Sequence, residues 1–208
     1  MALYRQVLCP QLIKATGRGL VTAPTIMNSD FGKYALIERE RRFLLRELPE
    51  PLTRASKHVQ IWDNYITNTR LRLRKIRVPE TKEYKWKLTQ KFAPDVEDLS
   101  RTVITNTYLS RAEYEVLSVF EGNEIRKNRY PFEHEGRIFG IDLFLGALWG
   151  LILAETSFET DEEMESLTQP PFAFMDVTND PMFAGGSLVK LSFEDLKSEM
   201  EKRLKGTE

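Results

Sequence analysis

Polar and apolar side chains alternate along most of the chain between residues 34 and 158, and this alternation predicts β-strands. Successive side chains of a strand point to opposite sides, so residues two apart share a face. Turn-forming residues such as Pro49, Pro51 and Gly136 separate the alternating stretches. The eight predicted strands span residues 35–45, 60–66, 69–77, 83–92, 100–108, 124–132, 137–144 and 149–158.

Three helices are predicted from N-terminal capping pairs, in which a Ser or Thr is followed three residues later by an acid. They span residues 110–120, 160–167 and 193–204, and residues 170–186 are predicted to be irregular. The fold class we expect is α+β, mainly β: eight antiparallel strands with the helices packed around the outside. The capping pairs are Ser110 with Glu113, Thr160 with Glu163, and Ser192 with Asp195.

Length and composition favour one folded domain after a short extension. The 208 residues are 41% hydrophobic, which is enough for one substantial core. We expect this domain to span residues 34–208. Residues 1–33 carry bases but no acid until Asp30 and show no hydrophobic period, so we expect a disordered or non-native extension, with translation starting at Met27 in the latter case. A basic, acid-poor segment is also typical of a targeting peptide.

The overall charge and the cysteine content exclude several classes of function. Basic and acidic side chains nearly balance, 30 against 31, so no nucleic-acid partner is expected. The single cysteine, Cys9, excludes an internal disulfide and a cysteine-rich zinc site, and favours a cytoplasmic location. No apolar run approaches the roughly 18 residues that span a bilayer, so no membrane partner is expected. The sequence does not indicate an oligomeric state.

Charged residues are segregated on single faces of four predicted strands. For one strand alone, a solvated polar face is the ordinary explanation, and exposed bases on edge strands oppose aggregation. Several such strands together also fit a barrel whose charged faces line a central channel, with the apolar faces covered from outside. The sets are Glu38, Glu40 and Arg42; Arg70, Arg72 and Arg74; Lys85, Lys87, Thr89 and Lys91; and Lys127 with Arg129.

A charged channel is costly unless its charges are paired or hold a ligand. A ligand with several negative charges would neutralise the arginines and lysines. Divalent cations would neutralise Glu38 and Glu40, because Mg²⁺ and Mn²⁺ prefer hard oxygen ligands. A metal-bound polyphosphate satisfies both requirements.

The same residues resemble the motifs of CYTH domains, which belong to the triphosphate tunnel metalloenzyme family. Residues 37–45 are similar to the family's opening E-x-E-x-K strand, with Arg42 in the lysine position. The resemblance continues in order to residue 158, through an arginine strand (70–74), a lysine strand (85–91), a K-x-R strand (127–130) and two late acidic strands (141–144 and 153–155).

The resemblance implies an eight-stranded tunnel and metal-dependent hydrolysis, by water, of inorganic tripolyphosphate or an organic triphosphate. The small-molecule partner is then a triphosphate and the cofactor Mg²⁺ or Mn²⁺. Carried over by position, the catalytic residues are Glu38, Glu40, Arg42 and Asp142, and the metal ligands are Glu38, Glu40 and Glu155. The implied substrate-binding residues are Arg70, Arg72, Arg74, Lys85, Lys87, Lys127 and Arg129.

Two departures from the family pattern weaken a second metal site. Family members carry glutamates on the fifth strand just after an arginine, where this chain has Thr102 to Thr105 after Arg101. They also carry a second glutamate two residues after the position of Glu155, where this chain has Ser157. The alternative to hydrolysis is therefore a catalytically weakened module that binds polyphosphate or a nucleotide. An adenylate cyclase is not expected, and a purely structural barrel with solvated charges is the third interpretation.

Two further charged segments allow two interpretations each. The acids Asp161, Glu162, Glu163 and Glu165 form a solvated helix face or, less simply, a metal site. The final helix carries four lysines that either stay exposed or reach phosphate across one tunnel mouth. These lysines are Lys190, Lys197, Lys202 and Lys205.

Overall fold

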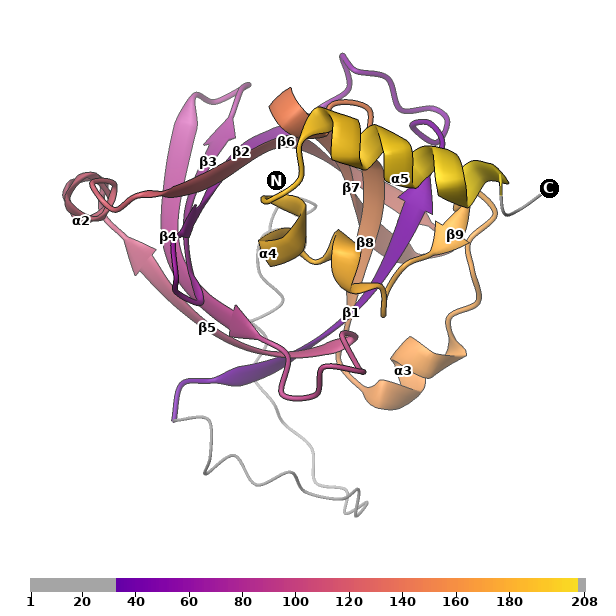
Figure 1. Ribbon diagram of the computed structural model, residues 1–208, viewed down its shortest axis with the longest axis horizontal. Helices are drawn as coiled ribbons and strands as arrows, with labels where there is room; N and C mark the ends of the chain where they lie inside the picture. Colours follow the sequence, from indigo (N-terminus) through magenta and orange to yellow (C-terminus); the bar gives the residue numbers. More distant parts are fainter. Residues whose placement is uncertain (1–32, 206–208) are drawn as a thin grey trace.

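The computed structural model describes residues 33–205, which form a closed antiparallel barrel of eight strands (Figure 1). Neighbouring strands follow the order β5-β4-β3-β2-β6-β7-β8-β1, and β1 pairs again with β5 to close the ring. The predicted fold class is confirmed. The strands are β1 (Leu36–Leu45), β2 (Val59–Ile66), β3 (Leu71–Val78), β4 (Glu83–Phe92), β5 (Arg101–Leu109), β6 (Gly122–His134), β7 (Arg137–Leu145) and β8 (Ile152–Phe158).

The predicted helices exist, with shorter bounds at two places. Helix α2 (Arg111–Leu117) has the full Ser110 capping box, and α3 (Asp161–Ser166) starts where the Thr160 hydroxyl accepts from the Glu163 N–H. Helix α5 (Phe193–Lys205) follows Ser192. Strand β8 starts later than predicted because the 3-10 turn η1 (Gly146–Leu148) occupies the connection. Among residues 33–205, no helix has the length and apolarity needed to cross a membrane.

The stretch predicted to be irregular contains three short elements: β9 (Met175–Asp176), the 3-10 turn η2 (Pro181–Phe183) and α4 (Gly185–Leu188). Strand β9 pairs with the second half of β1, beyond the part that pairs with β5. Elements of two to four residues are too short to show a hydrophobic period. Tertiary contacts hold them instead, such as the hydrogen bond from the Val177 N–H to the Arg42 carbonyl at 2.9 Å.

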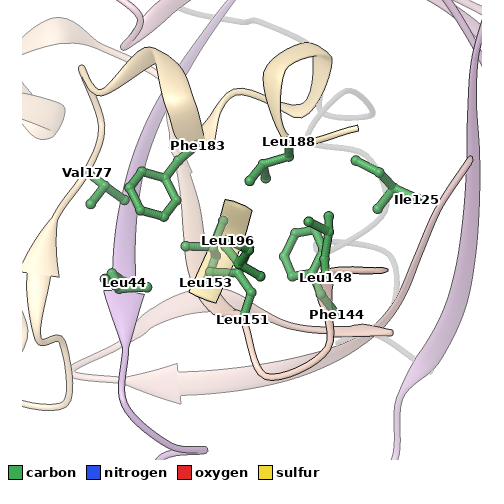
Figure 2. Packing of buried hydrophobic residues seen from close by; sticks show 10 residues of the cluster. All are labelled: Leu44, Ile125, Phe144, Leu148, Leu151, Leu153, Val177, Phe183, Leu188 and Leu196. Atoms are coloured by element: carbon green, nitrogen blue, oxygen red, sulfur yellow. The ribbon is translucent and has the colours of Figure 1, made fainter. Parts of the chain in front are cut away.

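This C-terminal segment, in which no helix was predicted, closes one end of the barrel. Viewed down the barrel, α4 lies within the ring of strands (Figure 1). Phe183 and Leu188 pack on side chains at that end of the strands, in the cluster that Figure 2 shows. Burial of this apolar surface drives the closure. The buried cluster consists of Leu44, Ile125, Phe144, Leu148, Leu151, Leu153, Val177, Phe183, Leu188 and Leu196.

A second apolar cluster lies on the outer wall, where Phe43, Tyr130 and Ile141 are fully buried. Leu48, Leu52 and other residues outside the strands pack over it. Phe43 and Leu44 are consecutive on β1 and belong to the two different clusters, as the alternation of a strand requires. The apolar faces therefore point outward along most of the barrel. They point inward at the closed end and, toward the opposite end, at the small buried cluster of Val59, Ile61 and Ile76.

The division of the chain at residue 34 stays a prediction, because residues 1–32 lie outside the described part.

Replacing Phe183 by alanine is expected to lower the free energy of unfolding by about 3–5 kcal/mol, because the ring is only 1% exposed within the closing cluster. Urea unfolding followed by tryptophan fluorescence measures the change. The control is Phe193→Ala at the start of α5, where the side chain is 44% exposed and the loss is expected to stay below about 1 kcal/mol. Equal losses in the two variants would contradict the closed end.

Candidate functional site

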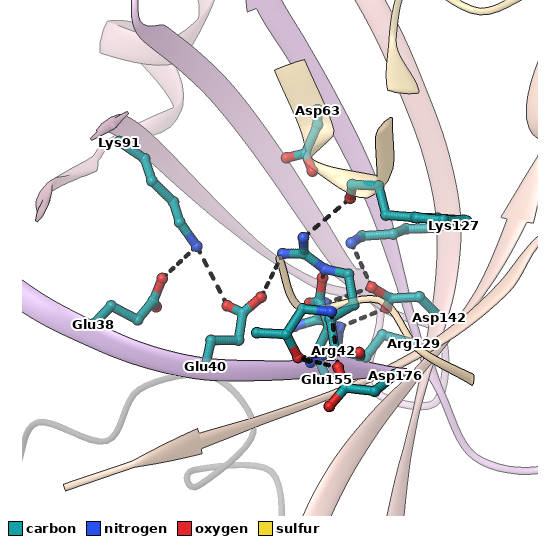
Figure 3. Close-up of polar contacts among 12 residues, drawn as sticks. Glu38, Glu40, Arg42, Asp63, Lys91, Lys127, Arg129, Asp142, Glu155 and Asp176 are labelled. Atoms are coloured by element: carbon teal, nitrogen blue, oxygen red, sulfur yellow. Dashed lines mark hydrogen bonds and ion pairs between the residues drawn. The ribbon is translucent and has the colours of Figure 1, made fainter. Parts of the chain in front are cut away.

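The register of the barrel brings the segregated charges onto its inner face. Residues that pair across neighbouring strands share a face, and the pairs include Arg42 with Glu155, Asp63 with Arg74, Arg74 with Lys87, and Arg129 with Asp142. Charged side chains gather there, among them Glu38, Glu40, Arg42 and Asp142, which Figure 3 labels. The bases are Arg42, Arg72, Arg74, Lys87, Lys91, Lys127 and Arg129, and the carboxylates are Glu38, Glu40, Asp63, Asp142 and Glu155.

Glu38 and Glu40 converge on one ammonium group. Lys91 Nζ donates to Glu38 Oε2 at 2.6 Å and to Glu40 Oε2 at 3.3 Å. Burial raises the pKa of Glu38, but the charge and hydrogen bond of Lys91 together with the charge of Arg72 leave that pKa below its usual value. Burial lowers the pKa of Lys91, and the two glutamates more than reverse this. Glu38 and Lys91 therefore stabilise each other in the charged form.

Arg42 connects this group to the next carboxylate. Its guanidinium donates to Glu40 Oε1 and, at 3.0 Å, to Glu155 Oε1. It also donates to the carbonyl of Phe183 at 3.1 Å, which ties the charged lining to the closed end. Burial opposes the ionisation of Glu155, yet Lys127, Arg129 and Arg42 together hold its pKa well below the usual range.

Asp142 anchors two further bases on the neighbouring strand, β6. Its side chain is fully buried, and it accepts hydrogen bonds from Arg129, with one N–O distance of 2.6 Å, and from Lys127. Arg129 also bonds to Glu155. Gly140 makes room for this arrangement, because a Cβ there would lie 3.1 Å from Arg129 Cδ. Lys127 and Arg129 are thus held in place on a rigid strand.

Asp63 is a site residue that the sequence prediction missed. It is 1% exposed and binds Arg74 through both oxygens, with distances of 2.5 and 2.7 Å. The Arg72 guanidinium lies 3.7 Å away. Burial raises the pKa of Asp63, and the two arginines lower it much further. A lone acid between Ile61 and Tyr65 on the inner face was the signal available in the sequence.

Two bases near Asp63 lack a full complement of anions. Arg72 Nε is buried without a hydrogen-bond partner, and Lys87 has no hydrogen bond or ion pair with any described residue. Burial, followed by repulsion from Arg74 and Arg72, lowers the pKa of Lys87 to about 7. Seven bases face five carboxylates, so the lining carries two excess positive charges when Lys87 is protonated. The excess positive charge in this part of the barrel favours binding of an anion.

Two predicted substrate-binding residues do not join the enclosed group. Arg70 is exposed, and its guanidinium stacks over the ring of Phe92 at 4.3 Å. Lys85 belongs to the inner face by register but is exposed near the open end. The structure brings together the remaining predicted side chains. Glu155 is among them, but it pairs with Arg42 and Arg129 rather than with Lys91 beside Glu38 and Glu40.

The charged helices lie away from the barrel interior. Lys190, Lys197 and Lys202 are exposed, and the last two pair with acids of their own helix. The side chain of Lys205 lies outside the described part. On α3, Asp161 is not simply solvated, since it accepts hydrogen bonds at 2.8 Å from both Arg39 and Arg101. These pairs fasten α3 to β1 and β5.

The oxygen donors near Lys91 fit one divalent cation, although they do not include three carboxylates. Among residues 33–205, no three or more His, Cys, Asp or Glu side chains are grouped so as to hold a metal ion. Glu38 and Glu40 nevertheless already share a cation, the Lys91 ammonium. Thr102 lies opposite Glu38 with a buried hydroxyl that lacks a hydrogen-bond partner. The two carboxylates and this hydroxyl are all hard oxygen donors, so these residues fit Mg²⁺ or Mn²⁺.

The register also explains the two departures in the sequence. Thr102 pairs with Glu38, and Ser157 pairs with Glu40. The acids absent at these positions would therefore have lain on the inner face beside Glu38 and Glu40.

The chain is similar to two curated proteins that are both named inorganic triphosphatase. The protein from Acetivibrio thermocellus is 36% identical over 104 residues, which are 45% of this chain and 65% of that protein. The protein from Nitrosomonas europaea is 31% identical over 91 residues, or 38% of this chain and 60% of that protein. The chain thus spans less than two thirds of the length of these relatives. No protein-family model matches it.

Solved structures support the fold. The crystal structure of the hypothetical protein NE1496 has a TM-score of 0.50 and 22% identity, covering 74% of this chain and 99% of that one. At this identity the likeness bears on the fold alone, the closed antiparallel barrel.

Replacing Lys87 by methionine is expected to raise the free energy of unfolding by about 2 kcal/mol at pH 6. This value is smaller than the full pKa shift would give, because water reaches part of the side chain and screens its charge. Lys87 has a pKa near 10.5 when unfolded and about 7 when folded. Below about pH 7 Lys87 is charged in the folded protein, and the repulsion is fully present. Between the folded and the unfolded pKa the unfolded chain binds more protons, so the unfolding free energy of the unchanged protein rises with pH. The increase in the free energy of unfolding in Lys87→Met should therefore be smaller at pH 9 than at pH 6. Urea unfolding at the two pH values measures it.

The matched control is Lys85→Met, on the same face of the same strand but exposed. A gain in Lys87→Met that is no larger than the control's, or that grows with pH, would show that Lys87 is not held against its charge.

Proposed function

We propose that the protein is a metal-dependent triphosphate hydrolase of the triphosphate tunnel (CYTH) family, acting on inorganic tripolyphosphate or on an organic triphosphate. The observation that carries the proposal is the enclosed pair Arg72 and Lys87. Both are cations without sufficient anions, and they lie in the same barrel as two carboxylates that already share a cation. A metal-bound triphosphate supplies anions to Arg72 and Lys87, and its metal ion suits the two carboxylates. The similarity to two inorganic triphosphatases supports the same reaction.

The bases of the lining bind the phosphate oxygens in this proposal. Arg72, Arg74 and Lys87 form one cationic wall, and Lys127 with Arg129 forms the other. Guanidinium groups match phosphate oxygens with paired N–H donors, and several cations in an enclosed site stabilise charge that develops on the transferred phosphoryl group. Because β-strands and ion pairs hold these side chains in advance, little reorganisation is needed when the substrate binds.

Glu38 and Glu40 bind the metal in this proposal, with Thr102 as a further oxygen donor. When bound, Mg²⁺ or Mn²⁺ neutralises phosphate charge and polarises the phosphoryl group toward attack by water. Arg42 orients Glu40 and Glu155 through its two hydrogen bonds. Asp142 is bonded to Lys127 and Arg129 on a fully buried side chain, so we assign it the positioning of these bases rather than contact with water.

A binding module without turnover is the second candidate. Thr102 and Ser157 stand beside Glu38 and Glu40 where further acids would support a second metal ion. A two-metal site activates the attacking water as well as the leaving oxygen, and a single metal ion does this less well. This candidate predicts tight binding of a triphosphate with no release of phosphate.

Phosphate release from tripolyphosphate, thiamine triphosphate and ATP, with Mg²⁺ or Mn²⁺, separates the two candidates. We expect release from at least one substrate, and a fall in kcat of about 100-fold or more in Glu40→Ala, because the enclosed metal ligand is lost. Glu47→Ala, an exposed glutamate just after β1, is the matched control and should keep full activity. Binding measured by calorimetry without any release would favour the module. The absence of binding to every triphosphate would refute both.

A further inference from the structure

The Lys91 ammonium lies where a metal ion shared by Glu38 and Glu40 would bind (Figure 3). The side chain comes from the end of β4 and reaches one oxygen of each carboxylate, at 2.6 and 3.3 Å. The ammonium is partly enclosed, and it bonds to both carboxylates. A lysine thus provides the positive charge that holds the two acids together in the substrate-free protein.

Lys91 and a divalent cation need the same oxygens. Glu38 offers Oε2 to Lys91, and Glu40 offers Oε2 while its Oε1 is bonded to Arg42. Two cations at one position in a medium of low dielectric repel each other strongly. A metal ion can therefore bind both carboxylates only after the ammonium has moved away.

The surroundings allow such a movement without disturbing the acids. Arg42 holds Glu40 from the other side through Oε1, so this carboxylate keeps its place when Lys91 leaves. Lys91 has a flexible four-carbon side chain, and it shares the inner face of β4 with Lys87, next to the unsatisfied cations. Phosphate oxygens bound at Arg72 and Lys87 would offer the ammonium a new anionic partner.

We propose that Lys91 competes with the divalent cation for Glu38 and Glu40, and that the cation enters this site together with the triphosphate. The inference rests on the proposed function and adds an order of binding to it. Metal alone binds weakly because it must displace a buried ion pair. Triphosphate relieves this competition by drawing Lys91 to phosphate oxygen. The coupling is reciprocal, so the metal strengthens triphosphate binding by the same factor.

The test measures Mn²⁺ binding without substrate, by electron paramagnetic resonance of the free ion, for the unchanged protein, Lys91→Gln and Lys85→Gln. Both variants remove one positive charge from the same face of β4, but Lys85 is exposed. We expect Mn²⁺ to bind Lys91→Gln at least about 10-fold more tightly than the other two proteins. Equal Mn²⁺ affinities in the three proteins would overturn the inference.

A second measurement avoids any dependence on the folding of Lys91→Gln. The unchanged protein is titrated with Mn²⁺ in the presence and absence of imidotriphosphate, a triphosphate analogue that resists hydrolysis. We expect at least about a 10-fold gain in Mn²⁺ affinity with the analogue, after correction for Mn²⁺ bound by the free analogue. Mn²⁺ binding that is equally tight without the analogue would overturn the inference.

The two proposals fail in different ways. If imidotriphosphate does not bind the unchanged protein, with or without Mn²⁺, the proposed function fails. If it binds but Mn²⁺ affinity is the same with and without it, only the role of Lys91 fails. Lys91→Arg keeps a cation between the glutamates and should bind Mn²⁺ alone as weakly as the unchanged protein. Tight binding by this variant would count against competition by charge.

Discussion

The structure depends on the mutual neutralisation of charges that the barrel encloses. Removing one partner of such a buried pair commonly costs about 3–5 kcal/mol, because the other charge is left uncompensated. Ion pairs link Glu38, through Lys91, Glu40, Arg42 and Glu155, to Arg129 in one continuous chain. This chain lets a charged lining exist inside a barrel. Its imperfect balance leaves Arg72 and Lys87 short of anions, and that deficit is the basis of the proposed affinity for a polyanion.

The apolar end of the barrel and the charged interior act together. Phe183 packs in the closing cluster and also offers its carbonyl to Arg42, so the segment that closes the end holds a base of the lining. Closure at one end limits the access of water, which strengthens the remaining electrostatic interactions. A ligand therefore enters from the opposite end, where β4 begins and where Lys85 is exposed. The departures at Thr102 and Ser157 affect the metal and leave this cationic wall unchanged.

Much of the fold could be predicted from the sequence, because alternation along a strand puts residues two apart, such as Arg72 and Arg74, on one face. The same alternation placed Glu38, Glu40 and Arg42 on the inner face correctly. Asp63 was missed because a single acid on a strand shows no period. The closing segment was missed because α4 and β9 are too short for a pattern and depend on contacts with β1. The partner of Lys91 could not be predicted, since the direction of a long side chain depends on charges from other strands.

The most direct test of the central claim is a crystal structure with imidotriphosphate and Mn²⁺. The account predicts phosphate oxygens within hydrogen-bonding distance of Arg72 and Lys87 inside the barrel, and an anomalous Mn²⁺ peak between Glu38 and Glu40. An analogue bound only to the outer wall, with Lys91 still bonded to both glutamates, would contradict it.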